Sequence, residues 1–313
     1  MPDHDLHHDP VLLKEVLEYL LTDQTTHFFD GTLGLGGHAE KVISCPSGLQ
    51  VYIGCDLDAQ HLEYADQRLK ALKAEKIKIQ LHQMNFSDIQ NVVPDNRSGS
   101  LSILLDLGLC SNHVDDASKG FSFSEDGPLN MSFSSNPLEN AETVLNHYEQ
   151  RDLTRIFREY GEEPAAFRIA RAINDKRKQQ PLRTTFELKE VISSQVSGQA
   201  LKKALTRIFQ AIRMEVNEEL HHLEHALADC LELMDTGDRL GVISYHSLED
   251  RVVKKFFAKS SKPETREGLH SLHEEVAPAK GALLTRKPIG PSDTELQKNP
   301  RSRSAKLRVI EKK

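Results

Sequence analysis

The sequence of 313 residues lacks the features of a membrane, secreted or metal-bound protein. No apolar run approaches the roughly 20 residues needed to cross a bilayer. The four cysteines, at positions 45, 55, 110 and 230, form no C-x-x-C pair, so they indicate neither a zinc site nor a disulfide framework. The first residues are polar and acidic, unlike a signal or transit peptide. We therefore expect a cytoplasmic protein with no metal ligands.

Charge is present in ordinary amount but is unevenly distributed. The net charge is −7, and residues 1–150 carry 9 Lys and Arg against 23 Asp and Glu, with a further acidic block at 214–279 (7 against 14). By contrast, residues 151–213 carry 14 basic and 7 acidic residues, and residues 280–313 carry 10 and 3. Two basic blocks on an acidic body are typical of a polyanion-binding surface, although solvated helix faces show similar charge runs.

The sequence is organised around a glycine-rich stretch near its start. Residues 27–38 read HFFDGTLGLGGH, which predicts a short strand ending at Asp30, a turn with four glycines, and the start of a helix. Glycine lets the backbone adopt positive φ and approach a ligand closely, and a helix N-terminus adds unpaired N–H groups. Such a turn is typical of a nucleotide or nucleoside cofactor site, although a plain tight turn has the same composition.

A second acidic strand end indicates which cofactor is bound. Residues 49–56 predict a buried strand ending at Asp56, which lies 20 residues after Gly36. At this spacing in a doubly wound sheet, a carboxylate meets ribose hydroxyls. A dinucleotide would bring its pyrophosphate close to the Asp30 carboxylate. S-adenosylmethionine instead carries a sulfonium and an ammonium cation, which a carboxylate favours. We therefore favour S-adenosylmethionine over NAD.

The remaining pattern predicts an α/β fold whose sheet is interrupted by helices. We expect the following elements, in chain order: a helix at 11–21, strands at 27–29 and 49–56, helices at 39–44 and 59–72, strands at 76–81 and 101–106, helices only from 141 to 227, a strand at 238–245, a helix starting near Ser247 as its N-cap, and a strand at 304–310. Residues 259–298 show no pattern and predict a loop. Polar strand ends predict ligands at the carboxyl edge of a parallel sheet.

Several motifs in this order resemble one family closely. They are DGTLGLGGH (30–38), LDLG (105–108), GFSF (120–123), DGPL (126–129), YGEE (160–163), RIARAI (168–173), FQAIR (209–213), HSLEDR (246–251) and NPRSRS (299–304). From about residue 8 to residue 312 the chain resembles the bacterial 16S ribosomal RNA (cytosine-N4)-methyltransferase family, also called MraW or small-subunit methyltransferase H.

The resemblance implies a class I S-adenosylmethionine-dependent methyltransferase fold, with a Rossmann-like sheet and an inserted helical domain. The methyltransferase domain would comprise residues 1–112 and 214–313, and the insertion, at 113–213, would help to hold RNA. The implied reaction is methylation of the exocyclic N4 of a cytidine in the decoding region of 16S rRNA. The implied partner is 16S rRNA or the small ribosomal subunit, and whether the chain forms a homodimer is left open.

The resemblance also implies site residues. Matched onto this chain, the cofactor-binding residues of the family are Gly36, Gly37, His38, Asp56, Phe86, Asp106 and His113. Phe86 would flank the adenine. Asp106, or a carbonyl of the loop behind it, is suited to accept a hydrogen bond from the amino group at cytosine N4, and Asp106 is the expected catalytic residue. Two segments depart from the family. Residues 110–113 read CSNH where the family has SSPQ, and residues 130–133 read NMSF where it has DMRM.

Three other functions are compatible with these residues. A NAD-dependent oxidoreductase would also use a glycine-rich turn and an acidic strand end. A non-catalytic rRNA-binding or ribosome-assembly factor could keep the fold without turnover, since His113 offers different donors and acceptors from a glutamine. A methyltransferase acting on a different nucleobase is the third alternative.

Overall fold

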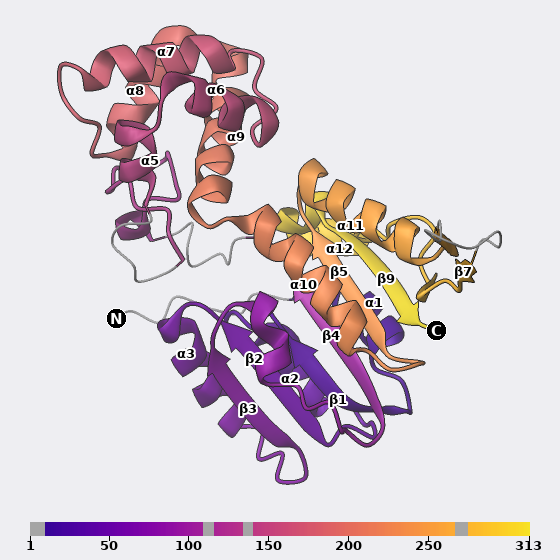
Figure 1. The fold of residues 1–313 in the computed structure, drawn as a ribbon. Helices are drawn as coiled ribbons and strands as arrows, with labels where there is room; N and C mark the ends of the chain where they lie inside the picture. The colour runs from indigo at the N-terminus through magenta and orange to yellow at the C-terminus, as the bar shows by residue number, and fades with distance from the viewer. Residues whose placement is uncertain (1–9, 109–115, 134–139, 267–274) are drawn as a thin grey trace. The chain divides into compact units, whose positions relative to one another are not determined.

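The computed structural model describes residues 10–108, 116–133, 140–266 and 275–313 (Figure 1). The chain divides into two compact units, Met1–Gly108 with His221–Lys313, and Leu109–Leu220. We call them unit 1 and unit 2. Unit 2 corresponds in sequence to the insertion that we expected at residues 113–213. No helix in the described ranges is both long and apolar enough to cross a membrane.

Unit 1 contains a seven-stranded sheet in the order β3-β2-β1-β4-β5-β9-β8. The strands are β1 (Thr25–Asp30), β2 (Val51–Asp56), β3 (Lys78–Gln83), β4 (Ser100–Asp106), β5 (Arg239–Ser244), β8 (Gly281–Leu283) and β9 (Lys306–Lys312). β1 to β5 pair in parallel, whereas β9 is antiparallel to both β5 and β8. The predicted Rossmann-like class I sheet is confirmed. Because β1, β2 and β4 are parallel neighbours, their carboxyl ends Asp30, Asp56 and Asp106 lie along one edge.

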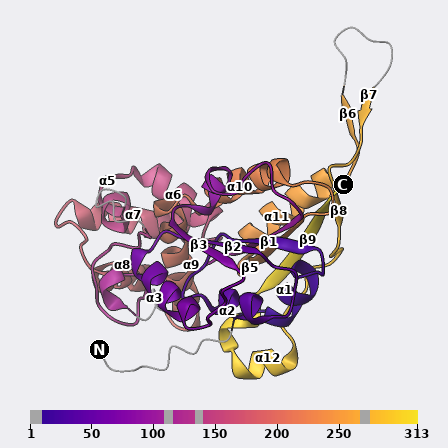
Figure 2. The ribbon, with the colours of Figure 1, turned by 90° about the horizontal axis from the view of Figure 1, so that it is seen from below.

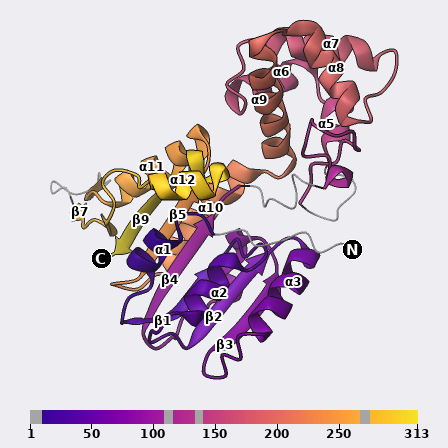
Figure 3. The ribbon, with the colours of Figure 1, turned by 180° about the vertical axis from the view of Figure 1, so that it is seen from behind.

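Helices cover both faces of this sheet (Figures 2 and 3). Side chains alternate along each strand, so successive apolar residues pack against helices on opposite faces. On one face, the core around Phe28 and Leu104 includes residues of α1 (Leu13–Leu20), α2 (Gly37–Ser44) and α3 (Ala59–Lys70). On the other, the core around Phe29 and Leu105 includes residues of α10 (Glu219–Leu233) and α11 (Ser247–Ser260). The sheet is therefore buried on both sides, which explains its nearly continuous apolar strands.

Residues 259–298 contain regular structure, so the loop prediction for them was wrong. β6 (Glu264–Arg266) pairs antiparallel with β7 (Glu275–Ala277), and β8 and α12 (Asp293–Lys298) follow. The 3₁₀ helices of unit 1 are η1 (Phe86–Asn91) and η3 (Pro300–Ser304). Strands of three residues are too short to show the two-residue period by which strands are recognised in a sequence.

Unit 2 is helical, as the pattern predicted. Its elements are η2 (Ala117–Lys119), α5 (Ala141–His147), α6 (Gln150–Glu159), α7 (Ala166–Arg177), α8 (Thr185–Gln195) and α9 (Gln199–Val216). The helices share a separate core that includes Phe157, Ile169 and Ile208. A hydrogen bond joins the segment before α5 to the residues just before α8: the backbone N–H of Leu129 donates to the carbonyl of Arg183 at 2.9 Å.

A buried ion pair joins the beginnings of β4 and β5. Asp238 is 1% exposed, its Oδ1 accepts from the backbone N–H of Leu101 at 2.7 Å, and its Oδ2 accepts from the backbone N–H of Asp235 at 2.8 Å. The guanidinium of Arg97, whose side chain is fully buried, also donates to Asp238 Oδ2. Such a pair is costly to break, because the remaining charge stays buried.

We expect Asp238→Ala to lower the free energy of unfolding by about 3–5 kcal/mol, as for a buried pair that loses one partner. The matched control is Asp235→Ala, which removes a carboxylate that also lies 2.9 Å from Arg97 but is 71% exposed. Because an exposed ion pair contributes little, this control should change stability by less than about 1 kcal/mol. Urea unfolding of both variants makes the comparison, and equal effects would contradict the role given to burial.

Candidate active site

The glycine-rich turn after β1 is closely packed against the end of β4 and the start of η1. The backbone N–H of Gly31 donates to the carbonyl of Leu104 at 3.0 Å. A Cβ at Gly31 would lie 2.6 Å from Leu105 Cδ2 and 2.7 Å from Phe86 Cβ, so no other residue fits without displacing its neighbours. Gly36 has φ +76° and is the N-cap of α2, a left-handed conformation that favours glycine. At Gly31 and Gly36 the turn therefore packs its backbone closely against neighbouring side chains.

Asp56, at the end of β2, holds this turn from the other side. Its Oδ2 accepts from the backbone N–H of Gly34 at 2.8 Å, and its Oδ1 accepts from the backbone N–H of Asp58 at 2.8 Å. The side chain is 14% exposed. His61 Nδ1 lies 3.5 Å from Oδ1. A carboxylate has about four lone-pair positions, so capacity for a ligand hydroxyl remains. The placement fits the predicted contact with a ribose.

Asp106, at the end of β4, is held by groups from three different elements. Its Oδ1 accepts a hydrogen bond from the hydroxyl of Tyr245 at 2.8 Å, and its backbone N–H donates to Thr32 Oγ1 at 2.7 Å. His38 Nδ1, from the first turn of α2, lies 3.6 Å from Asp106 Oδ2. The Asp106 side chain is 20% exposed, so its carboxylate is fixed but accessible.

Burial governs the protonation of this group. It raises the pKa of Asp106 to about 7, in spite of the Tyr245 hydrogen bond, which favours the ionised form. Burial also lowers the pKa of His38, against the charge of Asp30 and the bond between His38 Nε2 and the carbonyl of Val11 at 3.0 Å. Since that carbonyl only accepts, Nε2 carries the proton and Nδ1 faces Asp106 as an acceptor.

The raised pKa has a consequence for stability. The folded-state pKa of Asp106 lies above the unfolded value, so its contribution to stability is fully present below about pH 4 and is lost as the pH rises through about 7. At neutral pH the ionised form is therefore held at a cost to the fold.

Asp30 differs from the other two carboxylates in its burial. It is 1% exposed, its Oδ2 accepts from the hydroxyl of Tyr52 at 2.8 Å, and its Oδ1 accepts from the backbone N–H of Thr32 at 3.1 Å. Burial raises the pKa of Asp30, and the Tyr52 hydrogen bond opposes this rise. Asp30 therefore shapes the turn, and the acidic groups left for a ligand are Asp56 and Asp106.

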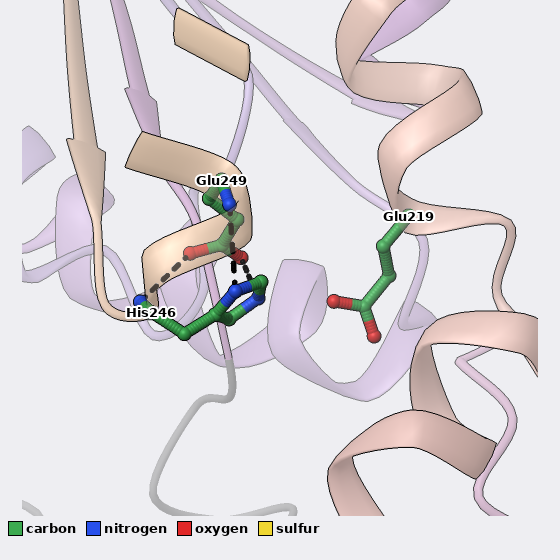
Figure 4. A group of neighbouring side chains, drawn as sticks. All are labelled: Glu219, His246 and Glu249. Atoms are coloured by element: carbon green, nitrogen blue, oxygen red, sulfur yellow. Dashed lines mark hydrogen bonds and ion pairs between the residues drawn. The ribbon is translucent and has the colours of Figure 1, made fainter. Parts of the chain in front are cut away.

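A capping box follows β5, and our prediction of its N-cap was also wrong. The N-cap of α11 is His246 and not Ser247: His246 Nδ1 accepts from the backbone N–H of Glu249, and Glu249 Oε2 accepts from the backbone N–H of His246 (Figure 4). Glu249 Oε2 also accepts from the backbone N–H of Tyr245 at 2.9 Å. The cap thus fixes the backbone of the residue whose hydroxyl holds Asp106.

The structure places six of the seven expected site residues at this edge of the sheet. Gly36, Gly37 and His38 form the N-cap and first turn of α2, Asp56 and Asp106 end their strands, and Phe86 is half-buried at the start of η1. His113 lies outside the described residues. The sequence analysis missed Tyr245 and Thr32 as partners of Asp106. The polar strand end at Tyr245 was a signal for the first of these.

These residues fit S-adenosylmethionine. The glycine turn lies between the ends of β1, β2 and β4, and the Asp56 carboxylate beside it is partly exposed to a ligand. Asp106 supplies an accessible carboxylate beside it, which favours a nearby cation. Phe86 is half-buried next to Gly31. A bulky anion such as pyrophosphate would meet carboxylates at two strand ends, Asp56 and Asp106.

Comparison with known proteins shows the family of this chain. The family model described as the MraW methylase family matches residues 5–313. "Ribosomal RNA small subunit methyltransferase H" of Ruminiclostridium cellulolyticum is 37% identical over 309 residues, covering 97% of this chain and 98% of the relative. The proteins of the same name from Chlorobium luteolum and Prosthecochloris aestuarii are 39% and 40% identical, covering 98% and 99% of this chain and 97% and 96% of their own length.

The Tyr245 hydroxyl gives a direct test of how Asp106 is held. In Tyr245→Phe the ring remains but the bond that favours the ionised carboxylate is lost, so the pKa of Asp106 should rise by roughly one pH unit. Carbon-13 NMR of labelled aspartate carboxyls should find Asp106 titrating near pH 7 in the wild type and higher in the variant.

The matched control is Tyr52→Phe, which removes the corresponding hydroxyl from Asp30. The Asp106 titration should move far less in this control. If Tyr245→Phe left the Asp106 titration where it is in the wild type, the hydrogen bond would not be setting the charge of the site.

Proposed function

Because the chain belongs to the MraW methylase family, we propose that it methylates the exocyclic N4 of a cytidine in the decoding region of 16S rRNA. The methyl donor is S-adenosylmethionine, the cofactor of methyltransferases with this fold. The observation that carries the proposal is the Asp106 carboxylate, which the Tyr245 hydroxyl holds at the end of β4, beside the glycine turn. Family membership decides against the NAD-dependent oxidoreductase.

We assign the cofactor contacts to the residues that surround this turn. Asp56 accepts hydrogen bonds from the ribose, the first turn of α2 at Gly36, Gly37 and His38 approaches the ligand with its backbone, and Phe86 flanks the adenine. Bound S-adenosylmethionine supplies an electrophilic methyl group on a sulfonium. His113 is proposed as a further cofactor contact, on the resemblance alone.

Asp106 has the chemistry that N4 methylation needs. The amino group of cytosine is a poor nucleophile because its lone pair is delocalised into the ring. A carboxylate that accepts a hydrogen bond from this amine orients N4 and draws density toward nitrogen, and it can take the proton that the methylated amine must lose. Asp106 does this only when ionised, and a pKa of about 7 keeps the acceptor form populated at neutral pH.

Unit 2 is the proposed RNA-holding part. Residues 151–213, which form most of its helices, carry 14 basic and 7 acidic residues. Lys and Arg that neutralise phosphates release counterions, so RNA affinity should fall as salt rises. A base inside a duplex would first have to leave the stack, at a cost of a few kcal/mol. Small-subunit RNA or the subunit particle is therefore the proposed substrate, and the cytoplasm remains the predicted location.

The product decides between this function and the two alternatives that remain. Purified protein, S-adenosylmethionine and small-subunit rRNA should yield N4-methylcytidine on nucleoside mass spectrometry. A methylated base other than N4-methylcytidine would support a different methyltransferase. RNA binding with no methylated nucleoside would support the non-catalytic assembly factor.

Asp56→Ala should weaken S-adenosylmethionine binding by about 1.5–3 kcal/mol, the contribution of hydrogen bonds to a charged group. Calorimetry on the folded variant measures this loss. The control is Asp66→Ala, which removes a 44% exposed carboxylate of α3 that pairs with Lys70 and should leave cofactor affinity unchanged. Wild-type affinity in Asp56→Ala would remove Asp56 from the cofactor site.

A further inference from the structure

Among the described residues, the large apolar side chains that are exposed to solvent are two phenylalanines, and both lie in unit 2. Phe167, in α7, is 53% exposed, and Phe186, in α8, is 37% exposed. An exposed aromatic ring has no role in a core, and it adds nothing to helix stability that a polar residue would not. Each ring therefore needs a separate explanation.

The position of Phe167 does not follow from the folding of α7. The helix buries Ala166, Ile169, Ala170 and Ile173, a run of positions at helical spacing that forms its complete apolar stripe. Phe167 follows Ala166 directly and lies beside that stripe, on a solvent-exposed flank of the helix. No ring or cation of the described residues stacks on it.

The charges beside Phe167 also run against helix preferences. The first turn of α7 contains no acidic residue and carries Arg168, although helix N-termini favour negative charge. Arg168 is exposed, and no carboxylate in the described part of the chain pairs with it. Arg171 is four residues after Phe167 and therefore on the same face. Its ion pair with Asp175, at 3.8 Å, is exposed and weak.

Phe186 differs from Phe167 because one face of its ring is already covered. Lys189 Nζ lies 4.7 Å from the centroid of its ring, so a cation already covers one ring face. The backbone N–H of Phe186 donates to Asp126 Oδ1 at 3.1 Å, which places a carboxylate beside it. Phe186 thus provides an internal comparison: an exposed ring of the same type with an occupied face and a neighbouring negative charge.

We propose that Phe167 is a stacking platform for one unpaired base of the RNA substrate, with Arg168 and Arg171 binding the phosphates on either side. Base–aromatic stacking flanked by cations is the usual chemistry of single-stranded RNA recognition. A protein partner fits less well, because a single ring between two unpaired or weakly paired arginines does not make the apolar centre of a stable interface. The proposal rests on the proposed function, since it names the part of the same substrate that unit 2 holds.

The absence of tryptophan makes this contact directly observable. Phe167→Trp and Phe186→Trp each give a full-length protein with one fluorophore. A ten-nucleotide single-stranded RNA of mixed sequence should quench the fluorescence of Phe167→Trp, because the base stacks on the indole, whereas the same sequence as a blunt duplex should quench it far less. Phe186→Trp should respond weakly to both.

Binding of small-subunit rRNA to unlabelled variants provides the second measurement. Phe167→Ala and Phe167→Leu should both weaken RNA binding by about 5- to 150-fold, the range for one lost base–aromatic stack. Leucine restores apolar area but not the π face, so it separates stacking from simple burial. Arg168→Glu with Arg171→Glu should also weaken binding and reduce its salt dependence. S-adenosylmethionine affinity should be unchanged in all of these variants.

The outcomes distinguish this inference from the proposed function. Quenching of Phe167→Trp by the single strand, together with weaker rRNA binding of both Phe167 variants, supports the stacking platform, even if the wild type forms no N4-methylcytidine. Absent quenching, equal quenching of the two tryptophan variants, or wild-type rRNA affinity of Phe167→Ala would overturn it, even in a protein that methylates 16S rRNA normally.

Discussion

The site depends on one constraint: the carboxylate of Asp106, at the end of β4, is largely buried but keeps one part exposed to a ligand. Asp106 stays in position because Tyr245 donates to one oxygen, while Thr32 accepts from its backbone. His38 Nδ1 lies 3.6 Å from the other oxygen, and its ring is fixed by the carbonyl of Val11. Thr32 lies in the glycine turn, His38 lies in the first turn of α2, and the capping box of α11 fixes the backbone of Tyr245.

The three carboxylates at the edge of the sheet have separate tasks because their surroundings differ. Asp30 is buried and shapes the turn with Tyr52, whereas Asp56 accepts two backbone N–H groups and keeps capacity for a ligand. Asp106 alone combines access with a pKa of about 7. At neutral pH the ionised form of such a group lowers the stability of the folded state. Sites that require a perturbed pKa commonly carry this cost.

The sequence predicted the sheet and the helices that interrupt it, because long apolar strands and helical periodicity are local signals. Strand-end carboxylates and a glycine turn are also local, and they indicated a candidate site at the carboxyl edge of the sheet. The residue pattern could not show that Asp30 is buried while Asp106 is partly exposed, since the burial of each carboxylate is set by neighbours such as Tyr52 and Tyr245. The partner hydroxyl of Asp106 lies 139 residues away in sequence, and only the parallel pairing of β4 with β5 brings it close. The short strands between residues 259 and 298 left no periodic signal. The capping role of His246 was assigned to Ser247 because serine is the commoner cap.

The most direct test of this account is the single-turnover rate of N4-methylcytidine formation as a function of pH. For the wild type the rate should rise with pH through about 7, as Asp106 loses its proton. Asp106→Ala should form almost no product while still binding S-adenosylmethionine and rRNA, because the interaction it removes is strongest in the transition state. Substantial N4-methylcytidine from Asp106→Ala, with a pH profile like that of the wild type, would contradict the central role of this carboxylate.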